Sequence, residues 1–336
     1  MEAIDVINIL NGSISIVNKI FPMILLIIGT FGHLCNLLIF SKRTQRTNPT
    51  SVCFLANTIV NLISLYFGML PRYLTDIANI DLINTNITVC KLRSFFQYLS
   101  LSLSNWFLLL ATIDRYIISS NDHTRRRLSN LKRAWYSIGF LTILFILLYC
   151  HILILYNIQS SFCYPRYGPY RLFNDIQIFI QYSLLPPILM TLFGLLTIRN
   201  IHLTRRHSNN QGNIRVRQRD IQLSKMLLLQ VIITVICSLP LIISNLEVTT
   251  TLTIMKSPLR LAIENFLSQI ARHLAYLNCS ISFYLYTLTG SQFRLESRQI
   301  INQFSMFLCH RRILNRRQIG IDNRPIGPST REARRQ

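Results

Sequence analysis

Apolar residues gather into seven long runs along the chain, and short polar segments separate them. Each run is close to the ~20 residues that a helix needs to cross the hydrocarbon core of a bilayer. A helix is the expected form, because every backbone polar group inside lipid needs a partner within its own segment. The runs cover roughly residues 20–41, 52–74, 92–118, 134–156, 176–199, 223–246 and 261–288. The pattern predicts an all-α membrane protein, a seven-transmembrane helix bundle.

Composition supports a bilayer rather than water as the surroundings of the bundle. Half of the 336 residues are hydrophobic and 14% are charged, whereas a soluble protein of this size needs more polar surface. The third and seventh runs are more polar than the others, so we expect them to face protein more than lipid. The predicted division is an N-terminal tail (1–19), the bundle (20–289), an amphipathic eighth helix (290–308) and a disordered basic tail (309–336).

Basic residues are concentrated in alternate connections. The net charge is +22, which by itself would suit nucleic-acid binding. Lys and Arg, however, avoid the apolar runs and gather between runs one and two, three and four, five and six, and after run seven. By the positive-inside rule these segments are cytoplasmic, which puts the N-terminus outside. We therefore expect a multi-pass plasma-membrane protein with no nucleic-acid partner, whose charge favours anionic inner-leaflet lipid.

Further signals lie in the segments assigned to the exterior. Asn11 and Asn86 begin glycosylation sequons, and no cleaved signal peptide precedes the first run. Cys90 and Cys163 are the two cysteines that fall outside near helix ends, where an oxidising exterior would let them pair. On the other side, Cys309 is followed by two arginines and is a candidate palmitoylation site.

Several short motifs occur at suggestive places in the runs. Asp114, Arg115 and Tyr116 end the third run, 24 residues after Cys90. The remaining motif residues are Gly32 and Asn36 in run one, Pro186 and Pro187 in run five, Pro240 in run six and Tyr286 in run seven. Over about residues 20–308 the chain resembles the rhodopsin-like (class A) G-protein-coupled receptors, as a divergent, peptide-receptor-like member. That resemblance implies a Cys90–Cys163 bridge, an extracellular ligand and a heterotrimeric G protein as partner.

Some positions depart from the pattern of that family. Ser238 stands where most members carry a tryptophan, and Ser282 and Phe283 replace the Asn-Pro before Tyr286. Asn61 stands where most carry a sodium-coordinating aspartate. These departures leave the fold prediction intact and weaken the inference that activation follows the usual internal relay.

Arg115 is costly inside a bilayer unless it has a partner. Asp114 adjoins it, and Asp220, 20 residues before Pro240, matches the family's acidic latch position. We hypothesise that Arg115–Asp114 and Arg115–Asp220 contacts hold the inner face closed, and that their release lets run six swing outward. The alternative is a static ion pair that only anchors the topology.

Midway along the bundle lie five uncharged polar residues at positions that surround sodium in the rhodopsin-like receptors, the family that this chain resembles. They are Asn36, Asn61, Ser104, Asn278 and Ser282. A hard cation prefers carboxylates, so we expect little or no sodium dependence, no metal and no cofactor. The alternative role is hydrogen bonding between helices.

The resemblance places a ligand pocket in the outer halves of runs three, five, six and seven. The candidate residues are Gln97, Tyr98, Leu101, Asn245, Arg272 and Tyr276. Gln97 lies where amine receptors carry Asp, which argues against an amine ligand. Arg272 could anchor an anionic group or pair with Glu247 or Glu264. The basic, aromatic outer loop at 157–171 favours a short peptide, with small apolar or acidic molecules left open.

The predicted function is therefore that of a G-protein-coupled receptor for an extracellular ligand. No enzymatic constellation is present: the sequence has no phosphate-binding glycine loop and no spaced Cys/His metal set. A receptor-like scaffold without G-protein coupling is one alternative, because of the altered motifs in runs six and seven. A transporter is the other, although no internal repeat is visible.

Overall fold

The computed structural model describes residues 2–78, 81–120, 122–159, 162–207, 214–251, 254–290, 293–295 and 297–299, without the side chains of 2, 3, 78, 123 and 204–225. The helical segments are α1 (Glu2–Phe40), α2 (Arg43–Arg46), α3 (Pro49–Ile63), η1 (Ser64–Met69), α4 (Leu70–Ala78), α5 (Leu82–Thr85), α6 (Ile87–Ser119), α7 (His123–Arg126), α8 (Leu131–Tyr149), α9 (His151–Leu155), α10 (Pro169–Ile178), η2 (Phe179–Leu184), α11 (Leu185–His207), α12 (Ile214–Thr250), α13 (Pro258–Ser280) and α14 (Ser282–Thr289). Strands β1 (Tyr156–Gln159) and β2 (Phe162–Pro165) pair antiparallel.

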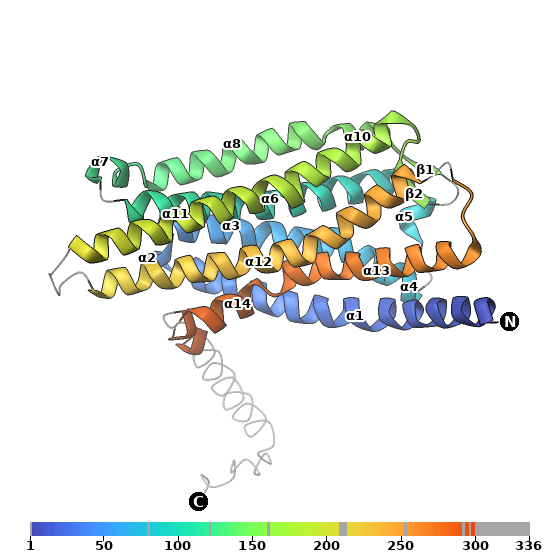
Figure 1. The fold of residues 1–336 in the computed structure, drawn as a ribbon, viewed down its shortest axis with the longest axis horizontal. Helices are drawn as coiled ribbons and strands as arrows, with labels where there is room; N and C mark the ends of the chain where they lie inside the picture. The colour runs from blue at the N-terminus through green and yellow to red at the C-terminus, as the bar shows by residue number, and fades with distance from the viewer. Residues whose placement is uncertain are drawn as a thin grey trace, which may run out of the picture.

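The long helices run lengthwise beside one another as one bundle (Figure 1). The β1–β2 hairpin lies at one end, and Cys163 of β2 is bonded there to Cys90 of α6, with 5.7 Å between their Cα atoms. The predicted disulfide is thus present. We call this the disulfide end, and the opposite end, which holds α2 and α7, the Arg115 end.

All seven apolar runs fall within helical segments, and six described helices are long and apolar enough to cross a membrane. The seventh run, folded as α13 and α14, is more polar than the rest, as the sequence predicts. One boundary differs from expectation. Residues expected as an N-terminal tail continue α1 from Glu2, giving 39 residues and about 58 Å of helix. A bilayer core is ~30 Å thick, so part of α1 extends beyond it.

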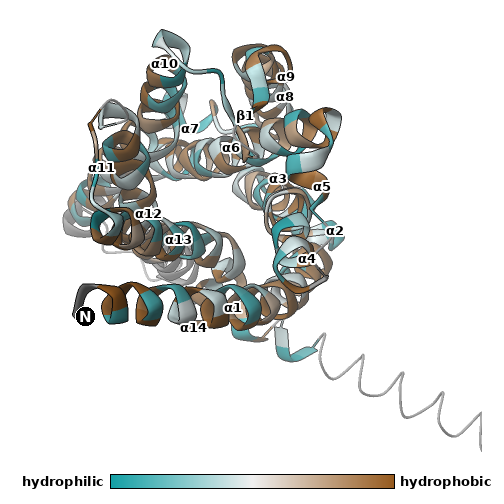
Figure 2. Ribbon diagram, turned by 90° about the vertical axis from the view of Figure 1, so that its right-hand side faces the viewer, coloured by the Kyte–Doolittle hydropathy of each residue, from teal (hydrophilic) through white to brown (hydrophobic). Residues whose placement is uncertain are grey.

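The bundle carries apolar side chains on its outside. On α8, Phe140, Ile143 and Leu147 are more than 60% exposed and share one face by their spacing. Ile138 and Phe145 form the buried face of the same helix. A helix that is apolar on both faces suits lipid on one side and protein on the other. Figure 2 looks at the bundle from the disulfide end and shows hydrophobic positions on all of the long helices.

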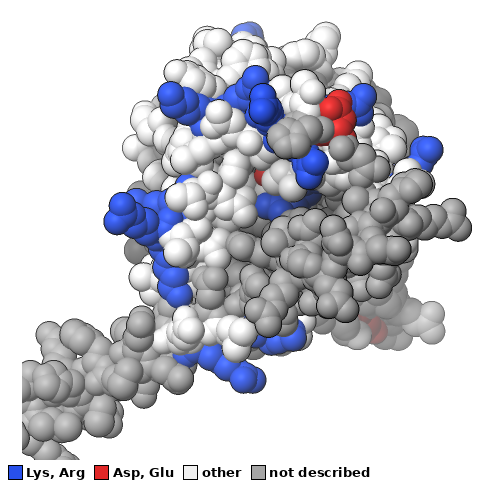
Figure 3. All heavy atoms as spheres, turned by 90° about the vertical axis from the view of Figure 1, so that its left-hand side faces the viewer, with Lys and Arg blue, Asp and Glu red and all other residues white. Residues whose placement is uncertain are grey.

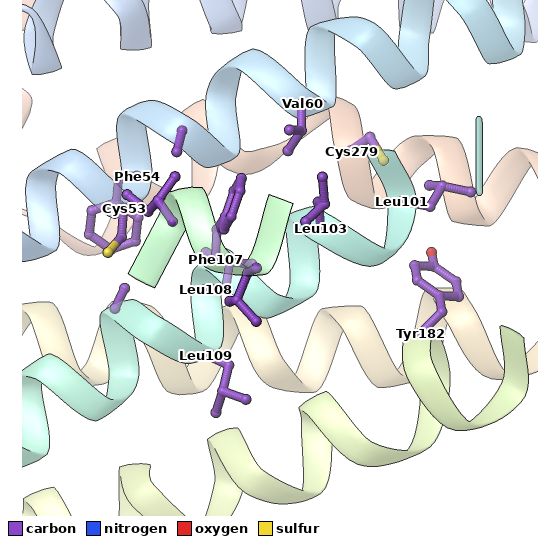
Figure 4. Packing of buried hydrophobic residues seen from close by; sticks show 14 of the residues in the cluster. Cys53, Phe54, Val60, Leu101, Leu103, Phe107, Leu108, Leu109, Tyr182 and Cys279 are labelled. Atoms are coloured by element: carbon purple, nitrogen blue, oxygen red, sulfur yellow. The ribbon is translucent and has the colours of Figure 1, made fainter. Parts of the chain in front are cut away.

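The core is centred on α6, which packs against α3, α8 and α11. Leu101, Leu103 and Leu108 of α6 and Phe54 and Val60 of α3 belong to one buried cluster (Figure 4). The core extends to Tyr286 of α14, which is fully buried and packs on the ring of Phe54 with 5.1 Å between centroids.

The two π-helical segments each end shortly before proline: η1 before Pro71, η2 before Pro186 and Pro187. Proline has no N–H, so it leaves carbonyls of the preceding turn without a helical donor. In η2 those carbonyls are used by α6. The Asn105 amide donates to the Tyr182 carbonyl at 2.8 Å, and the Trp106 indole donates to the Gln181 carbonyl at 2.9 Å. The family resemblance implies a kink at one of Pro186 and Pro187, and the structure shows a widened turn there that binds α6.

Gly29 lets α1 approach its neighbours closely. A Cβ at this position would lie 2.7 Å from Leu65 Cδ1 and 2.9 Å from Ser280 Oγ. Gly29→Ala should destabilise the protein by about 1–3 kcal/mol through overpacking. The measurement is the thermal unfolding midpoint of the purified full-length chain. Gly139→Ala is the matched control, because nothing lies within 4 Å of a Cβ there. Equal midpoints for the two variants would contradict the close packing of α1.

Candidate functional site

Arg115 lies near the end of α6, with 4% of its surface exposed. Its Nε donates to Thr50 Oγ1 at 2.8 Å, and its Nη2 donates to Asn48 Oδ1 at 3.1 Å. Asn48 is also the N-cap of α3: its Oδ1 accepts from the Thr50 backbone N–H, with Pro49 in the first turn. The guanidinium is therefore tied to the residues that start α3.

Asp114 is linked to Arg115 through Thr50. The Thr50 hydroxyl donates to Asp114 Oδ2, and Ser129 Oγ donates to Asp114 Oδ1 at 2.6 Å. Among the described ion pairs there is none between Asp114 and Arg115, so the hypothesised direct contact is replaced by a shared hydroxyl. The Asp220 side chain, the other half of the hypothesised latch, lies outside the described residues.

Tyr116, the third member of the motif, packs on Phe193 of α11 with 5.5 Å between ring centroids. The three motif residues therefore face different neighbours: Asp114 and Arg115 face α3 and the α6–α8 connection, and Tyr116 faces α11. Seen from the Arg115 end, the described surface is rich in Lys and Arg and poor in acids (Figure 3).

The predicted polar set forms three separate contacts rather than one cluster. Asn36 Nδ2 is 3.5 Å from Ser282 Oγ. Ser104 Oγ donates to Asn57 Oδ1 at 2.7 Å, and Asn61 Nδ2 approaches the same oxygen at 3.5 Å. These contacts join α1 to α14 and α3 to α6, which is the hydrogen-bonding role left open by the sequence.

The third contact connects α12 to α13. Asn278 Oδ1 accepts from Gln230 Nε2 at 3.3 Å and from Thr234 Oγ1 at 3.2 Å. Asn57, Gln230 and Thr234 were not singled out from the sequence. A pattern was available: Asn57 precedes Asn61 by four residues, and Gln230 precedes Thr234 by four, so each pair shares a helix face. Within the described residues no group of three His, Cys, Asp or Glu could hold a metal.

The two activation-motif residues of the sequence analysis lie in α12 and α14. Pro240 is inside α12, and Ser238 beside it is fully buried. Tyr286 lies among Phe40, Phe54 and Phe293, with ring centroids 5.1–6.3 Å from its own. An aromatic cluster thus holds the start of the post-bundle segment against α1 and α3.

The six candidate ligand residues differ in how exposed they are. Gln97, Leu101 and Tyr276 are buried, whereas Tyr98, Asn245 and Arg272 are partly exposed. Arg272 Nη1 donates to Gln269 Oε1 on its own helix at 2.8 Å. Its hypothesised acidic partners are engaged elsewhere: Glu264 pairs with Lys256 and Arg260, and Glu247 with Arg260.

The modification candidates lie on exposed helix positions or outside the description. Asn11 is exposed on α1, and Asn86 is the exposed N-cap of α6, accepting from the backbone N–H groups of Thr88 and Val89. Both sites remain predictions. Cys309 and most of the expected eighth helix lie outside the described residues.

Residues 32–286 match the family described as 7 transmembrane receptor (rhodopsin family). This match covers most of the chain and runs from Gly32 to Tyr286. The chain belongs to the rhodopsin family of seven-transmembrane receptors. The resemblance seen in the motifs is thereby confirmed, together with the seven-helix bundle fold.

The rhodopsin-family chain is also 31% identical over 111 residues to the mouse protein "C-C chemokine receptor 1-like protein 1". The matched part is 33% of this chain and 30% of the mouse protein, so it spans about a third of that relative's length. The departures at Ser238, Ser282 and Phe283 are therefore variations within a rhodopsin-family receptor.

Thr50→Val tests the hydroxyl that connects Asp114 to Arg115. Valine removes the bridge and leaves buried polar groups without their partner, which should lower the stability of the receptor by about 1–3 kcal/mol. The measurement is the thermal unfolding midpoint of the purified full-length protein. Thr142→Val is the control, since the described bond of the Thr142 hydroxyl is to the Ile138 carbonyl of its own helix, at 2.8 Å. An unchanged midpoint for Thr50→Val would show that the bridge contributes nothing.

Proposed function

We propose that this rhodopsin-family receptor lies in the plasma membrane with its N-terminus outside, binds an extracellular ligand and activates a heterotrimeric G protein. The observation that carries the proposal is Arg115, a buried guanidinium at the basic end of α6 that is held by hydrogen bonds to residues at the start of α3. Hydrogen bonds of this kind can be exchanged, so Arg115 can change partners when helices move.

The orientation follows from charge. Lys42, Arg43, Arg126, Lys132 and Arg133 all belong to connections at the Arg115 end. The positive-inside rule assigns that end to the cytoplasm, where a G protein binds. The disulfide end is then the exterior, which agrees with an oxidised Cys90–Cys163 pair.

The proposed transition is an outward movement of the cytoplasmic half of α12. Pro240 lies inside α12 and removes one helical hydrogen bond there, so bending is less costly at that point. The Asn278 contacts with Gln230 and Thr234 hold α12 to α13 in the closed arrangement. Release of an Asp220–Arg115 contact would free the inner end. A ligand drives this change only if it binds the open arrangement more tightly.

For the ligand we propose a short peptide. The outer hairpin and the start of α10 present aromatic and basic side chains: the Arg171 guanidinium lies 5.3 Å from the Tyr164 ring centroid and 5.8 Å from that of Tyr167. Aromatic and arginine side chains dominate the energetics of peptide and protein recognition. The name of the mouse relative refers to a chemokine receptor, which also favours a polypeptide ligand.

Asp220→Ala should raise ligand-free signalling. If the latch contributes about 1.4 kcal/mol, its loss raises the open-to-closed ratio about tenfold. The measurement is second-messenger output in cells at matched receptor density. Asp122→Ala is the control, because Asp122 lies in an exposed cytoplasmic connection and pairs with Arg125 at 3.8 Å. Basal output that stays at the level of the unmodified receptor would remove Asp220 from the mechanism.

The second candidate function is a receptor-like scaffold that binds its ligand without G-protein coupling, which Ser238, Ser282 and Phe283 favour. Arg115→Ala discriminates between the two. A coupled receptor should lose ligand-stimulated second-messenger output while it still binds ligand, because Arg115 faces the cytoplasmic end. Identical output from Arg115→Ala and the unmodified receptor, at equal surface expression, would favour the scaffold.

A further inference from the structure

Arg93 is a buried arginine at the disulfide end for which the sequence analysis found no role. It lies one turn after Cys90 in α6 and is 7% exposed. Its Nη2 donates to the Gly68 carbonyl of η1 at 2.9 Å. Its Nε is buried and has no hydrogen-bond partner in the described structure. One guanidinium edge is thus used by the protein, and a second donor is not.

The surroundings of Arg93 contain a second cation and no described carboxylate. The groups near enough to act electrostatically on its guanidinium are Arg72, Tyr98 and Tyr276. Arg72 is half-buried in α4, and its Nε is also without a partner. Asp76, one turn further along α4, acts on Arg72, but the two form no ion pair within 4 Å among the described residues.

Other acids at this end are already engaged. Glu264 holds Lys256 and Arg260, and Asp175 accepts from the Thr249 hydroxyl and acts on Arg171. Burying a guanidinium without a counter-charge costs free energy, and such residues in membrane proteins mark ligand or ion sites. The arrangement is therefore short of one negative charge.

The local backbone is shaped around Arg93 and Tyr276. Gly68 offers its carbonyl to Arg93, and a Cβ on Gly68 would lie 2.7 Å from the Tyr276 hydroxyl. That hydroxyl lies beside Arg93, close enough to interact with its guanidinium as a hydrogen-bond partner, and no other described group satisfies it. Gly68 belongs to the π-helical segment η1, and π-turns occur frequently at functional sites. Gln97, buried one turn beyond Arg93, lies on the same face of α6.

We propose that Arg93 and Arg72, with the Tyr276 hydroxyl, bind a carboxylate of the extracellular ligand. This inference rests on the proposed receptor function and names the chemical group that the ligand presents. The planar guanidinium fork matches a carboxylate in two parallel hydrogen bonds. Arg72, Arg93 and Lys19, offset by Asp76 and Asp81, leave about one positive charge, which suits a monoanion better than a phosphate group carrying nearly two negative charges. The anionic anchor expected at Arg272 is thereby moved to Arg93.

The first experiment uses the purified full-length receptor and two probes of the same shape, 3-phenylpropionate and 3-phenylpropionamide, each at about ten times a millimolar Kd. The thermal unfolding midpoint is measured with and without probe. We expect the acid to raise the midpoint more than the amide does. Equal shifts, or no shift with the acid, would overturn the proposal.

Arg93→Gln removes the charge and keeps a donor for the Gly68 carbonyl. It should abolish the preference for the acid and raise the probe-free midpoint, because an uncompensated buried charge is gone. Lys256→Gln is the matched control: Lys256 is also a cation at the disulfide end whose side chain is 7% exposed, but it pairs with Glu264. It should keep the preference and lower the midpoint.

Arg93→Lys guards against misreading a misfolded variant. Lysine keeps the positive charge but lacks the planar guanidinium that makes two parallel hydrogen bonds. The preference for the acid should therefore remain, while the affinity for the acid falls by about tenfold or more. If Arg93→Gln retains the acid preference, or is less stable than the unmodified receptor without probe, Arg93 is a structural residue and the proposal fails.

The source of the carboxylate is tested in cells with a promiscuous G-protein readout. Short peptides are applied in pairs with a free C-terminal carboxylate or a C-terminal amide, beside small organic acids. Peptide acids that act where their amides do not identify a peptide C-terminus, and activity confined to organic acids identifies a small acidic ligand. If the purified receptor binds the acid selectively but no probe or peptide causes signalling, the G-protein proposal is contradicted and the carboxylate site is supported. If peptide acids and their amides signal equally well, the carboxylate site is contradicted and the G-protein proposal is supported.

Discussion

The scarcity of water inside the bundle governs this structure. A polar group that leaves water must find a partner in the protein, or it costs several kcal/mol. Many polar groups of the described interior meet that demand through side chains that reach from one helix to the next. Asn105 and Trp106 of α6 take the carbonyls that the prolines of α11 leave free, and Asn57 of α3 accepts from Ser104. Satisfying these groups fixes which helices are neighbours.

The two buried arginines of α6 meet this constraint in different ways. Arg115 has hydrogen bonds to Thr50 and Asn48, so its contacts belong to the protein and can be exchanged by helix movement. Among the described residues, Arg93 donates to the Gly68 carbonyl and has the Tyr276 hydroxyl and a second cation, Arg72, as neighbours. One arginine is suited to a conformational change of the receptor and the other to an incoming anion. Both lie on one continuous helix, Ile87–Ser119, which provides a mechanical link between the two ends.

The departures from the family pattern acquire a physical meaning in this setting. Ser282 contacts Asn36, and Asn61 approaches Asn57, so both positions make contacts between uncharged polar side chains. Phe283 packs on Phe31 and Phe293, and replaces a helix-bending proline with aromatic packing. In the activation that we propose, these fixed contacts would leave the change of state to the Arg115 end and to Pro240.

The sequence by itself determined the seven helices and the disulfide, because bilayer thickness sets the length of an apolar run and only two cysteines fall outside near helix ends. Charge placement and the Asp114-Arg115-Tyr116 motif indicated the family. The tertiary structure alone decided the partners: Thr50 between Asp114 and Arg115, Gln230 and Thr234 on Asn278, and Gly68 on Arg93. Helical periodicity gives the face on which a residue lies. It does not give the rotation of one helix against another, which side-chain packing and the two π-helical turns fix.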